Sequence, residues 1–171
     1  MRALCVGECM VELRAIDDST MRVGYAGDTY NTAVYLRRAA DHLNVDIDVG
    51  YLTGLGTDEF SAEMRAAWAR EGVADRSIAL ADKLPGLYTV RIDEHGERRF
   101  SYWRSASAAR HLFAGTGWVA HLRDADVLVT GDVVDLHALA GNTSMVFHDA
   151  VAGDLETARA NWELLRPGVH A

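Results

Sequence analysis

A chain of 171 residues, with 49% hydrophobic and 25% charged residues, has the size and balance of one ordinary globular domain. Its formal net charge of −8 and pI near 5.3 argue against a nucleic-acid partner, because phosphate binding requires a basic face. No apolar run approaches the ~18 residues of a membrane span, and the first residues lack the pattern of a signal peptide. These features predict a cytoplasmic protein that binds neither nucleic acid nor a membrane.

The first half of the chain alternates between predicted strands and predicted helices. Strands are expected over 2–7, 9–14 and 45–53, with a polar loop or edge segment over 17–25. Helices are expected over 30–43, capped by Asp28 or Thr29, and between a cap at Asp58 and a stop at Gly72. The second helix carries one predicted buried face, formed by Phe60, Met64, Ala67 and Trp68. This alternation predicts βαβ units and an α/β fold with a mostly parallel sheet.

The second half of the chain begins with a predicted hairpin. Two β-rich runs, 84–92 and 98–104, are separated by a turn over 93–96. A hairpin within a βαβ series is an excursion from the main sheet, which either covers a site or ornaments an edge. Further strands are expected over 125–131 and 144–149, and a closing helix over 155–166. No repeat or linker interrupts the chain, so one domain is expected.

The cysteines and histidines predict no disulfide and no metal site. Cys5 and Cys9 would lie roughly 13 Å apart along one strand, too far for a disulfide, and are expected to be reduced and buried. The seven histidines form no pair with the spacing of zinc ligands.

The segment 26–32, AGDTYNT, places a glycine and polar residues before a predicted helix. Glycine lets a ligand approach the backbone, and the first-turn N–H groups of a helix are available donors. Asp28 and Asn31 add an acceptor and an amide for sugar hydroxyls. An ordinary helix cap with nothing bound explains the same residues, and a carboxylate pair for hydrolysis among Glu8, Glu12 and Asp28 also stays open.

Aromatic and basic residues lie on both arms of the hairpin, in Pro85-Gly86-Leu87-Tyr88 and Tyr102-Trp103-Arg104. A tyrosine hydroxyl, an aromatic face and an arginine fork suit a small acid, because arginine pairs with a carboxylate through two hydrogen bonds. Cross-strand aromatic packing beside a solvated arginine is the alternative. A third glycine segment, over 54–60, lacks the last glycine of a dinucleotide fingerprint and is interpreted as a strand-to-helix turn.

Together these stretches resemble a known family. They are GECMVEL at 7–13, GYAGDTYNTAVYL at 24–36, YLTGLGTDEFSAEM at 51–64, LPGLYTVRID at 84–93 and GERRFSYWRSASAA at 96–109. Their order and spacing are similar to those of the ribokinase-like (PfkB) carbohydrate kinases, and within them to the 2-keto-3-deoxygluconate kinases. The similarity covers about residues 3–131.

The resemblance implies a ribokinase-like, Rossmann-type sheet with a small β lid that includes the hairpin over 84–104. It also implies that Gly27, Asp28, Thr29, Tyr30 and Asn31 hold the sugar hydroxyls. From the lid, Tyr88, Tyr102, Trp103 and Arg104 would close on a small sugar acid, with Arg104 near the acid end.

In this family the second half of a longer chain supplies a GAGD segment with the general base, and the site for ATP and Mg²⁺. This sequence departs from the pattern over 132–171, and Ala152-Gly153-Asp154 is interpreted as a helix cap. The expectation is therefore a partial ribokinase-like domain over 1–171, truncated before the nucleotide-binding half, with no catalytic residue of its own and inactive alone. The alternatives are another ribokinase-like sugar kinase, or a non-catalytic module that binds sugar acids or forms a homo-oligomer through the lid.

Overall fold

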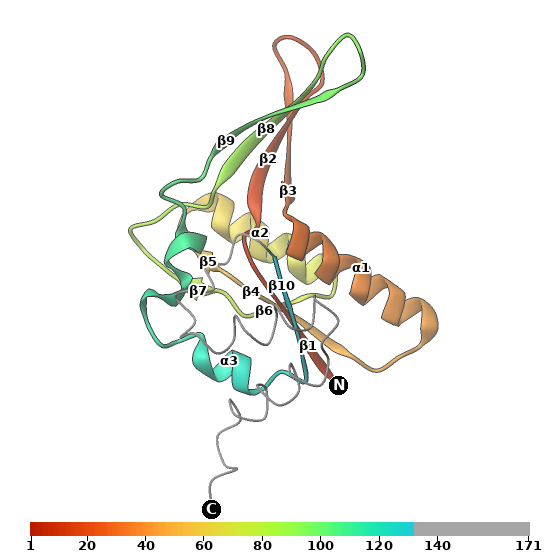
Figure 1. Ribbon diagram of the computed structural model, residues 1–171, viewed down its shortest axis with the longest axis vertical. Coiled ribbons are helices and arrows are strands. Elements are labelled where there is room, and N and C mark those ends of the chain that lie inside the picture. Colours follow the sequence, from red (N-terminus) through yellow and green to blue (C-terminus); the bar gives the residue numbers. More distant parts are fainter. Residues whose placement is uncertain (132–171) are drawn as a thin grey trace, which may run out of the picture. The chain divides into compact units, whose positions relative to one another are not determined.

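The computed structural model describes residues 1–131, which belong to one compact unit, Met1–Val134 (Figure 1). The strands are β1 (Arg2–Val6), β2 (Met10–Ala15), β3 (Met21–Ala26), β4 (Asp48–Leu52), β5 (Gly54–Leu55), β6 (Ala74–Asp75), β7 (Ile78–Ala79), β8 (Leu87–Ile92), β9 (Arg98–Trp103) and β10 (Val127–Thr130). The helices are α1 (Asp28–Leu43), α2 (Glu59–Arg70), α3 (Val119–Arg123) and a 3-10 helix over Ala108–Ala114. The strand predicted over 144–149, the helix over 155–166 and the cap at 152–154 lie outside the described residues.

The main sheet is parallel, with strand order β10-β1-β4-β6. Alternate residues of β1 and β4, among them Cys5 and Tyr51, point to one face, where they join buried residues of both α1 and α2 in a single core cluster. The two helices therefore cover the same face of the main sheet. This arrangement confirms the predicted α/β fold.

Aromatic packing holds the centre of this core. The ring of Tyr51 lies edge-on to those of Tyr30 and Trp68, with centroids 5.6 and 5.2 Å apart. Met64 and Trp68 form the buried face of α2, as predicted, but Phe60 is exposed. The prediction for Phe60 was wrong because this residue lies in the first turn of α2, where the buried position is taken by Ser61.

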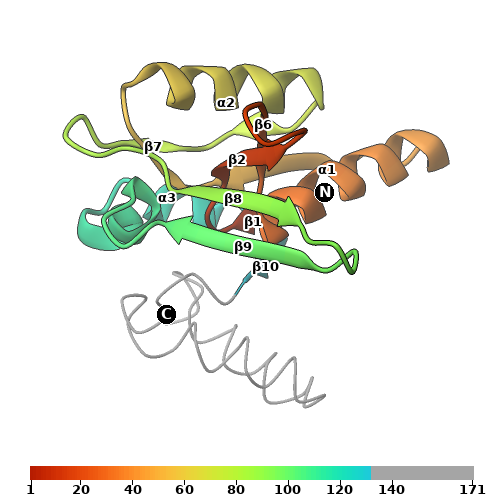
Figure 2. The same cartoon turned by 90° about the horizontal axis from the view of Figure 1, so that it is seen from above.

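The small sheet has strand order β3-β2-β8-β9 and extends away from the main sheet (Figure 1). The predicted hairpin is confirmed: β8 and β9 are antiparallel neighbours, visible side by side from above (Figure 2). The segment 17–25, expected as a loop or edge segment, contributes the edge strand β3, which pairs with β2 along its whole length. Its polar composition did not distinguish a loop from an edge strand, because much of β3 is exposed to solvent.

The two long helices begin by different means. At α2 the predicted cap is confirmed, because the Asp58 carboxylate accepts a hydrogen bond from the Ser61 N–H at 3.1 Å. At α1 the predicted side-chain cap is wrong: the N-cap is Gly27, which has no side chain to offer, and the helix begins at Asp28. After α2, Gly72 adopts a φ of 69°, the left-handed conformation that ends helices.

Both cysteines are buried free thiols, as predicted. Burial raises the pKa of Cys5 to about 11 and that of Cys9 to about 12, so both thiols are protonated near neutral pH. Among the helices of residues 1–131, none combines the length and apolar character needed to cross a membrane.

Candidate functional site

At the carboxyl edge of the main sheet the strand order reverses between β1 and β10. Such a topological switch point is where α/β proteins bind ligands. The chain leaves β1 for the small sheet, α1 and β4 on one side, whereas β10 joins β1 on the other side. Ligands of such sheets bind beyond the carboxyl ends of the strands where the order reverses. Here Gly7 follows the end of β1 and Gly131 follows the end of β10, and the carboxylate of Asp28 lies 2.4 Å from where a Cβ on Gly131 would be.

The predicted segment Gly27–Asn31 lies at this edge, but its side chains divide between the core and the surface. Thr29 is buried beside Gly7, and its hydroxyl is 3.1 Å from the hydroxyl of Tyr51. Tyr30 packs in the aromatic core. Asp28 and Asn31 are exposed and are the accessible side chains of this segment.

One face of the small sheet collects polar and aromatic groups in a row. In register across the four strands, Gly24 of β3, Glu12 of β2, Tyr88 of β8 and Tyr102 of β9 are direct neighbours. The rings of Tyr88 and Tyr102 have centroids 5.7 Å apart. Gly24 places no side chain at its end of the row, although a Cβ there would make only an ordinary van der Waals contact with the Glu12 carboxylate, at 3.8 Å.

Glu12 is the acceptor at the centre of this row. It accepts a hydrogen bond of 2.5 Å from the hydroxyl of Tyr88 and pairs with Arg14 at 3.0 Å. Burial, followed by the bond to Glu12, raises the pKa of Tyr88, so the hydroxyl remains a donor near neutral pH. Sequence reasoning weighed Glu12 only as half of a hydrolytic pair. The strand period of two residues places Glu12 on the same face as Met10, but its pairing with Tyr88 joins distant parts of the chain and has no local signal.

The hairpin residues predicted to act together are only partly brought together. Tyr88 and Tyr102 share a face with Phe100, whose ring stacks on that of Tyr102 at 6.1 Å. Trp103 pairs with Leu87, so it lies on the opposite face, and it is exposed. Side chains alternate along a strand, which separates Trp103 from its neighbour Tyr102.

Arg104 follows β9 and is held by an acidic partner. Its Nη2 lies 2.7 Å from Oε2 of Glu8, a carboxylate that is 1% exposed. Within residues 1–131 neither Glu8 oxygen nor Arg104 Nε has a hydrogen bond of good geometry, so the contact is an ion pair set by distance. The alternative of a fully solvated arginine does not describe this side chain, which is 26% exposed.

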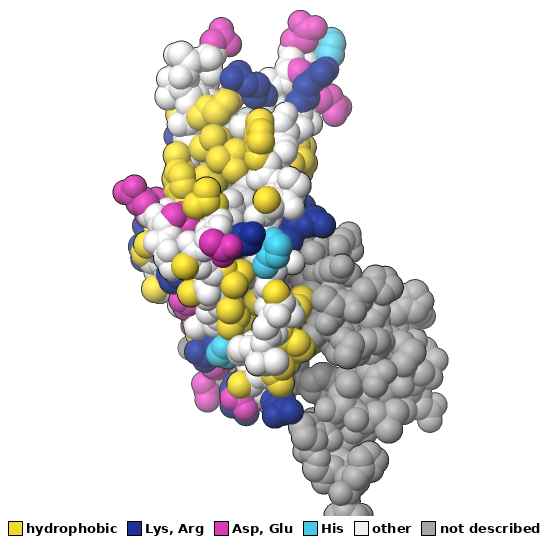
Figure 3. Space-filling view, turned by 90° about the vertical axis from the view of Figure 1, so that its left-hand side faces the viewer, with side chains coloured by type: hydrophobic (Ala, Val, Ile, Leu, Met, Phe, Trp, Pro, Cys, Tyr) yellow, Lys and Arg dark blue, Asp and Glu magenta, His cyan; other side chains and the backbone are white. Residues whose placement is uncertain are grey.

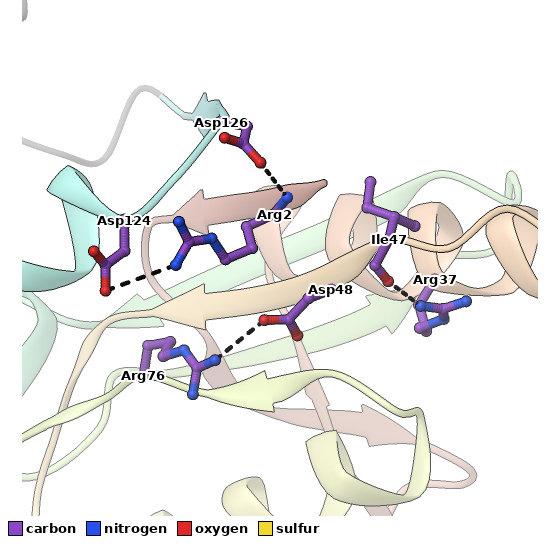
Figure 4. A network of polar contacts seen from close by, with 7 residues as sticks. All are labelled: Arg2, Arg37, Ile47, Asp48, Arg76, Asp124 and Asp126. Atoms are coloured by element: carbon purple, nitrogen blue, oxygen red, sulfur yellow. Dashed lines mark hydrogen bonds and ion pairs between the residues drawn. The ribbon is translucent and has the colours of Figure 1, made fainter.

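The opposite, amino edge of the main sheet also carries charges, which form a network of polar contacts (Figure 4). Several of them line a cavity of about 260 Å³. There Arg76 pairs with Asp48 at 3.3 Å, and Arg2 lies 3.9 Å from Asp124. Both guanidinium groups are thus compensated by carboxylates. Because ligand sites of parallel sheets lie at the carboxyl edge, the groups around Asp28, Glu12, Tyr88 and Arg104 form the better candidate site.

Residues 2–161 match the sequence pattern described as pfkB family carbohydrate kinase. The chain belongs to this family. It is 49% identical over 108 residues to 2-dehydro-3-deoxygluconokinase of Dickeya dadantii, an alignment that covers 62% of this chain and 34% of that protein. It is 37% identical over 127 residues to 2-dehydro-3-deoxygluconokinase of Haemophilus influenzae, covering 72% of this chain and 40% of that protein.

Solved structures support the same fold. The chain resembles fructokinase with bound ATP from Xylella fastidiosa, with a TM-score of 0.65 and 21% identity over 94% of this chain and 46% of the other. It resembles 2-dehydro-3-deoxygluconokinase of Thermotoga maritima with a TM-score of 0.66 and 19% identity over 90% of this chain and 48% of the other. The fold is therefore ribokinase-like, and the chain spans less than half the length of each of these relatives.

Proposed function

We propose that this chain forms the substrate-binding part of a sugar-acid kinase that phosphorylates the terminal hydroxyl of 2-dehydro-3-deoxygluconate. The observation that carries the proposal is its 49% identity over 108 residues, 62% of this chain, to a relative named 2-dehydro-3-deoxygluconokinase. The donor set suits such a ligand, because it joins an arginine for the carboxylate to acceptors for the hydroxyls. A preference for fructose, ribose or another neutral sugar would instead favour another kinase of the family.

Each group has a distinct proposed role in binding. Arg104 would donate to the carboxylate of the sugar acid, while Glu12 and Asp28 would accept from its hydroxyl groups. Tyr88 is a neutral phenol that donates to Glu12, and it would fix the position of the Glu12 carboxylate. Tyr102 offers an exposed ring to the apolar face of the sugar.

ATP would supply the phosphoryl group, as the family and the ATP-bound fructokinase suggest. Residues 1–131 contain no group of three or more histidine, cysteine or carboxylate side chains that could hold Mg²⁺. These residues alone therefore supply no complete set of metal ligands, and no step through Mg²⁺ or ATP is assigned to them. We expect this chain alone to bind the sugar acid without transferring phosphate, since transfer requires positioned charges around the phosphoryl group.

Titration calorimetry of the 171-residue chain tests the proposed substrate. We expect 2-dehydro-3-deoxygluconate to bind about ten- to hundred-fold more tightly than fructose or ribose, because one charge-assisted arginine contact contributes roughly 1.5–3 kcal/mol. Tighter binding of either neutral sugar would contradict the assignment. Binding of none of the three would reject it for this chain.

A second proposed role is self-association through the small sheet. Hydrophobic side chains gather over this sheet (Figure 3), and its exposed apolar residues include Ile92, Phe100 and Tyr102 on one face and Trp103 on the other. A solvent-exposed apolar patch beside an open strand edge favours pairing with a second copy. Sedimentation velocity should show a dimer that Phe100→Ser weakens, with Tyr35→Ser, an exposed position on α1, as the control. A monomer at all concentrations would exclude this role.

A further inference from the structure

Glu8 is a buried carboxylate to which the proposed binding roles assign no task. Of the carboxylates in residues 1–131 it alone is buried, at 1% exposure, immediately after β1 and Gly7. A buried charge is costly unless it is paired, and the one ion pair that Glu8 makes within these residues is with Arg104. The pair joins the carboxyl edge of the main sheet to the end of the small sheet.

Glycines of both predicted binding segments, Gly27 and Gly86, pack against Glu8. A Cβ on Gly27 would lie 2.2 Å from the backbone oxygen of Glu8, and a Cβ on Gly86 would lie 2.5 Å from its Oε1. The same Cβ on Gly86 would lie 3.2 Å from Cβ of Arg104. The glycines therefore make room for Glu8 and for its approach to Arg104, in addition to any room that they make for a ligand.

We propose that Glu8 is a positioning residue, which holds the Arg104 guanidinium ready for the carboxylate of the sugar acid. A guanidinium has five N–H donors in a rigid fork, and Glu8 occupies the Nη2 end, so further donors remain for a ligand. An arginine fixed before binding loses less rotamer freedom when the ligand arrives. This inference rests on the proposed function, because it assumes that Arg104 meets an acid.

The test is calorimetric titration of the 171-residue chain with 2-dehydro-3-deoxygluconate and with fructose. We expect Glu8→Gln to weaken binding of the acid about tenfold and to change fructose binding less than about twofold. In the background of Arg104→Met, Glu8→Gln should change neither affinity further, because its effect acts through Arg104. Asp93→Asn is the matched control: Asp93 pairs with Arg99 on the same sheet at 3.0 Å, and both affinities should stay unchanged.

The outcomes separate the inference from the proposed function. If the unsubstituted chain binds the acid and Glu8→Gln binds it equally well or more tightly, Glu8 does not position Arg104, while the proposed function stands. If the unsubstituted chain binds no acid, both are rejected. Should Glu8→Gln fail to fold, Glu8→Asp keeps the charge but withdraws the carboxylate by one methylene. It should weaken acid binding several-fold, and full affinity in that variant would overturn the inference.

Discussion

Replacing Arg104 with methionine should lower the free energy of unfolding by about 3 kcal/mol. The substitution keeps most of the side-chain volume but removes the cation that compensates Glu8, whose carboxylate is 1% exposed and 2.7 Å from Nη2. An uncompensated buried charge is among the largest single-residue penalties in proteins. Urea unfolding followed by tryptophan fluorescence measures the loss.

The rescue and the control make this expectation specific. Adding Glu8→Gln to Arg104→Met should restore part of the lost stability, because the buried charge is then removed as well. Arg99→Met breaks an ion pair of similar length, 3.0 Å, on β9, the strand that Arg104 follows, but the Arg99 side chain is 77% exposed. That variant should lose less than about 1 kcal/mol. Equal losses for Arg99→Met and Arg104→Met would show that the Glu8 charge does not depend on Arg104.

The same ion pair marks the limit of what the sequence could predict about the site. Local sequence patterns predicted the hairpin, and they placed the start of α1 within two residues although the expected side-chain cap was wrong, because these features depend on neighbouring residues. The Glu8–Arg104 pair joins residues far apart in the chain, one after β1 and one after β9. No local pattern carries that information, and Glu8 was weighed only as part of a hydrolytic pair.

Local sequence patterns also do not show which residues of a segment face solvent and which face the core. Residues 17–25 were expected as a loop or an edge segment, and the edge strand β3 forms there because backbone pairing with β2 does not require an apolar sequence at a sheet edge. Thr29 and Tyr30 were expected to hold a sugar, and the structure packs both against core residues. In the first turn of α1, Asp28 and Asn31 point to solvent, whereas Thr29 and Tyr30 point to the core. Membership in the motif alone does not tell which side chains are buried and which are exposed.

The Gly27→Ala variant should lose about 3 kcal/mol of stability together with binding of the sugar acid. The φ of Gly27 is 171°, an extended conformation open to any residue, so the cause is steric. An added Cβ would meet the Glu8 backbone oxygen at 2.2 Å and the Cys9 Cα at 3.4 Å. Backbone atoms cannot turn aside as a flexible side chain can, so α1 must move away from the segment that holds Glu8.

Gly115→Ala provides the matched control for this substitution. Gly115 also has an extended, negative φ, of −118°, and no neighbouring group among residues 1–131 lies within 4 Å of where its Cβ would be. Its stability should stay within about 0.5 kcal/mol of the unsubstituted chain, as for ordinary surface positions. Thermal unfolding and calorimetric titration of both variants give the comparison. If Gly27→Ala is as stable as Gly115→Ala and still binds the acid, the close approach of Gly27 to Glu8 is not needed to build the site.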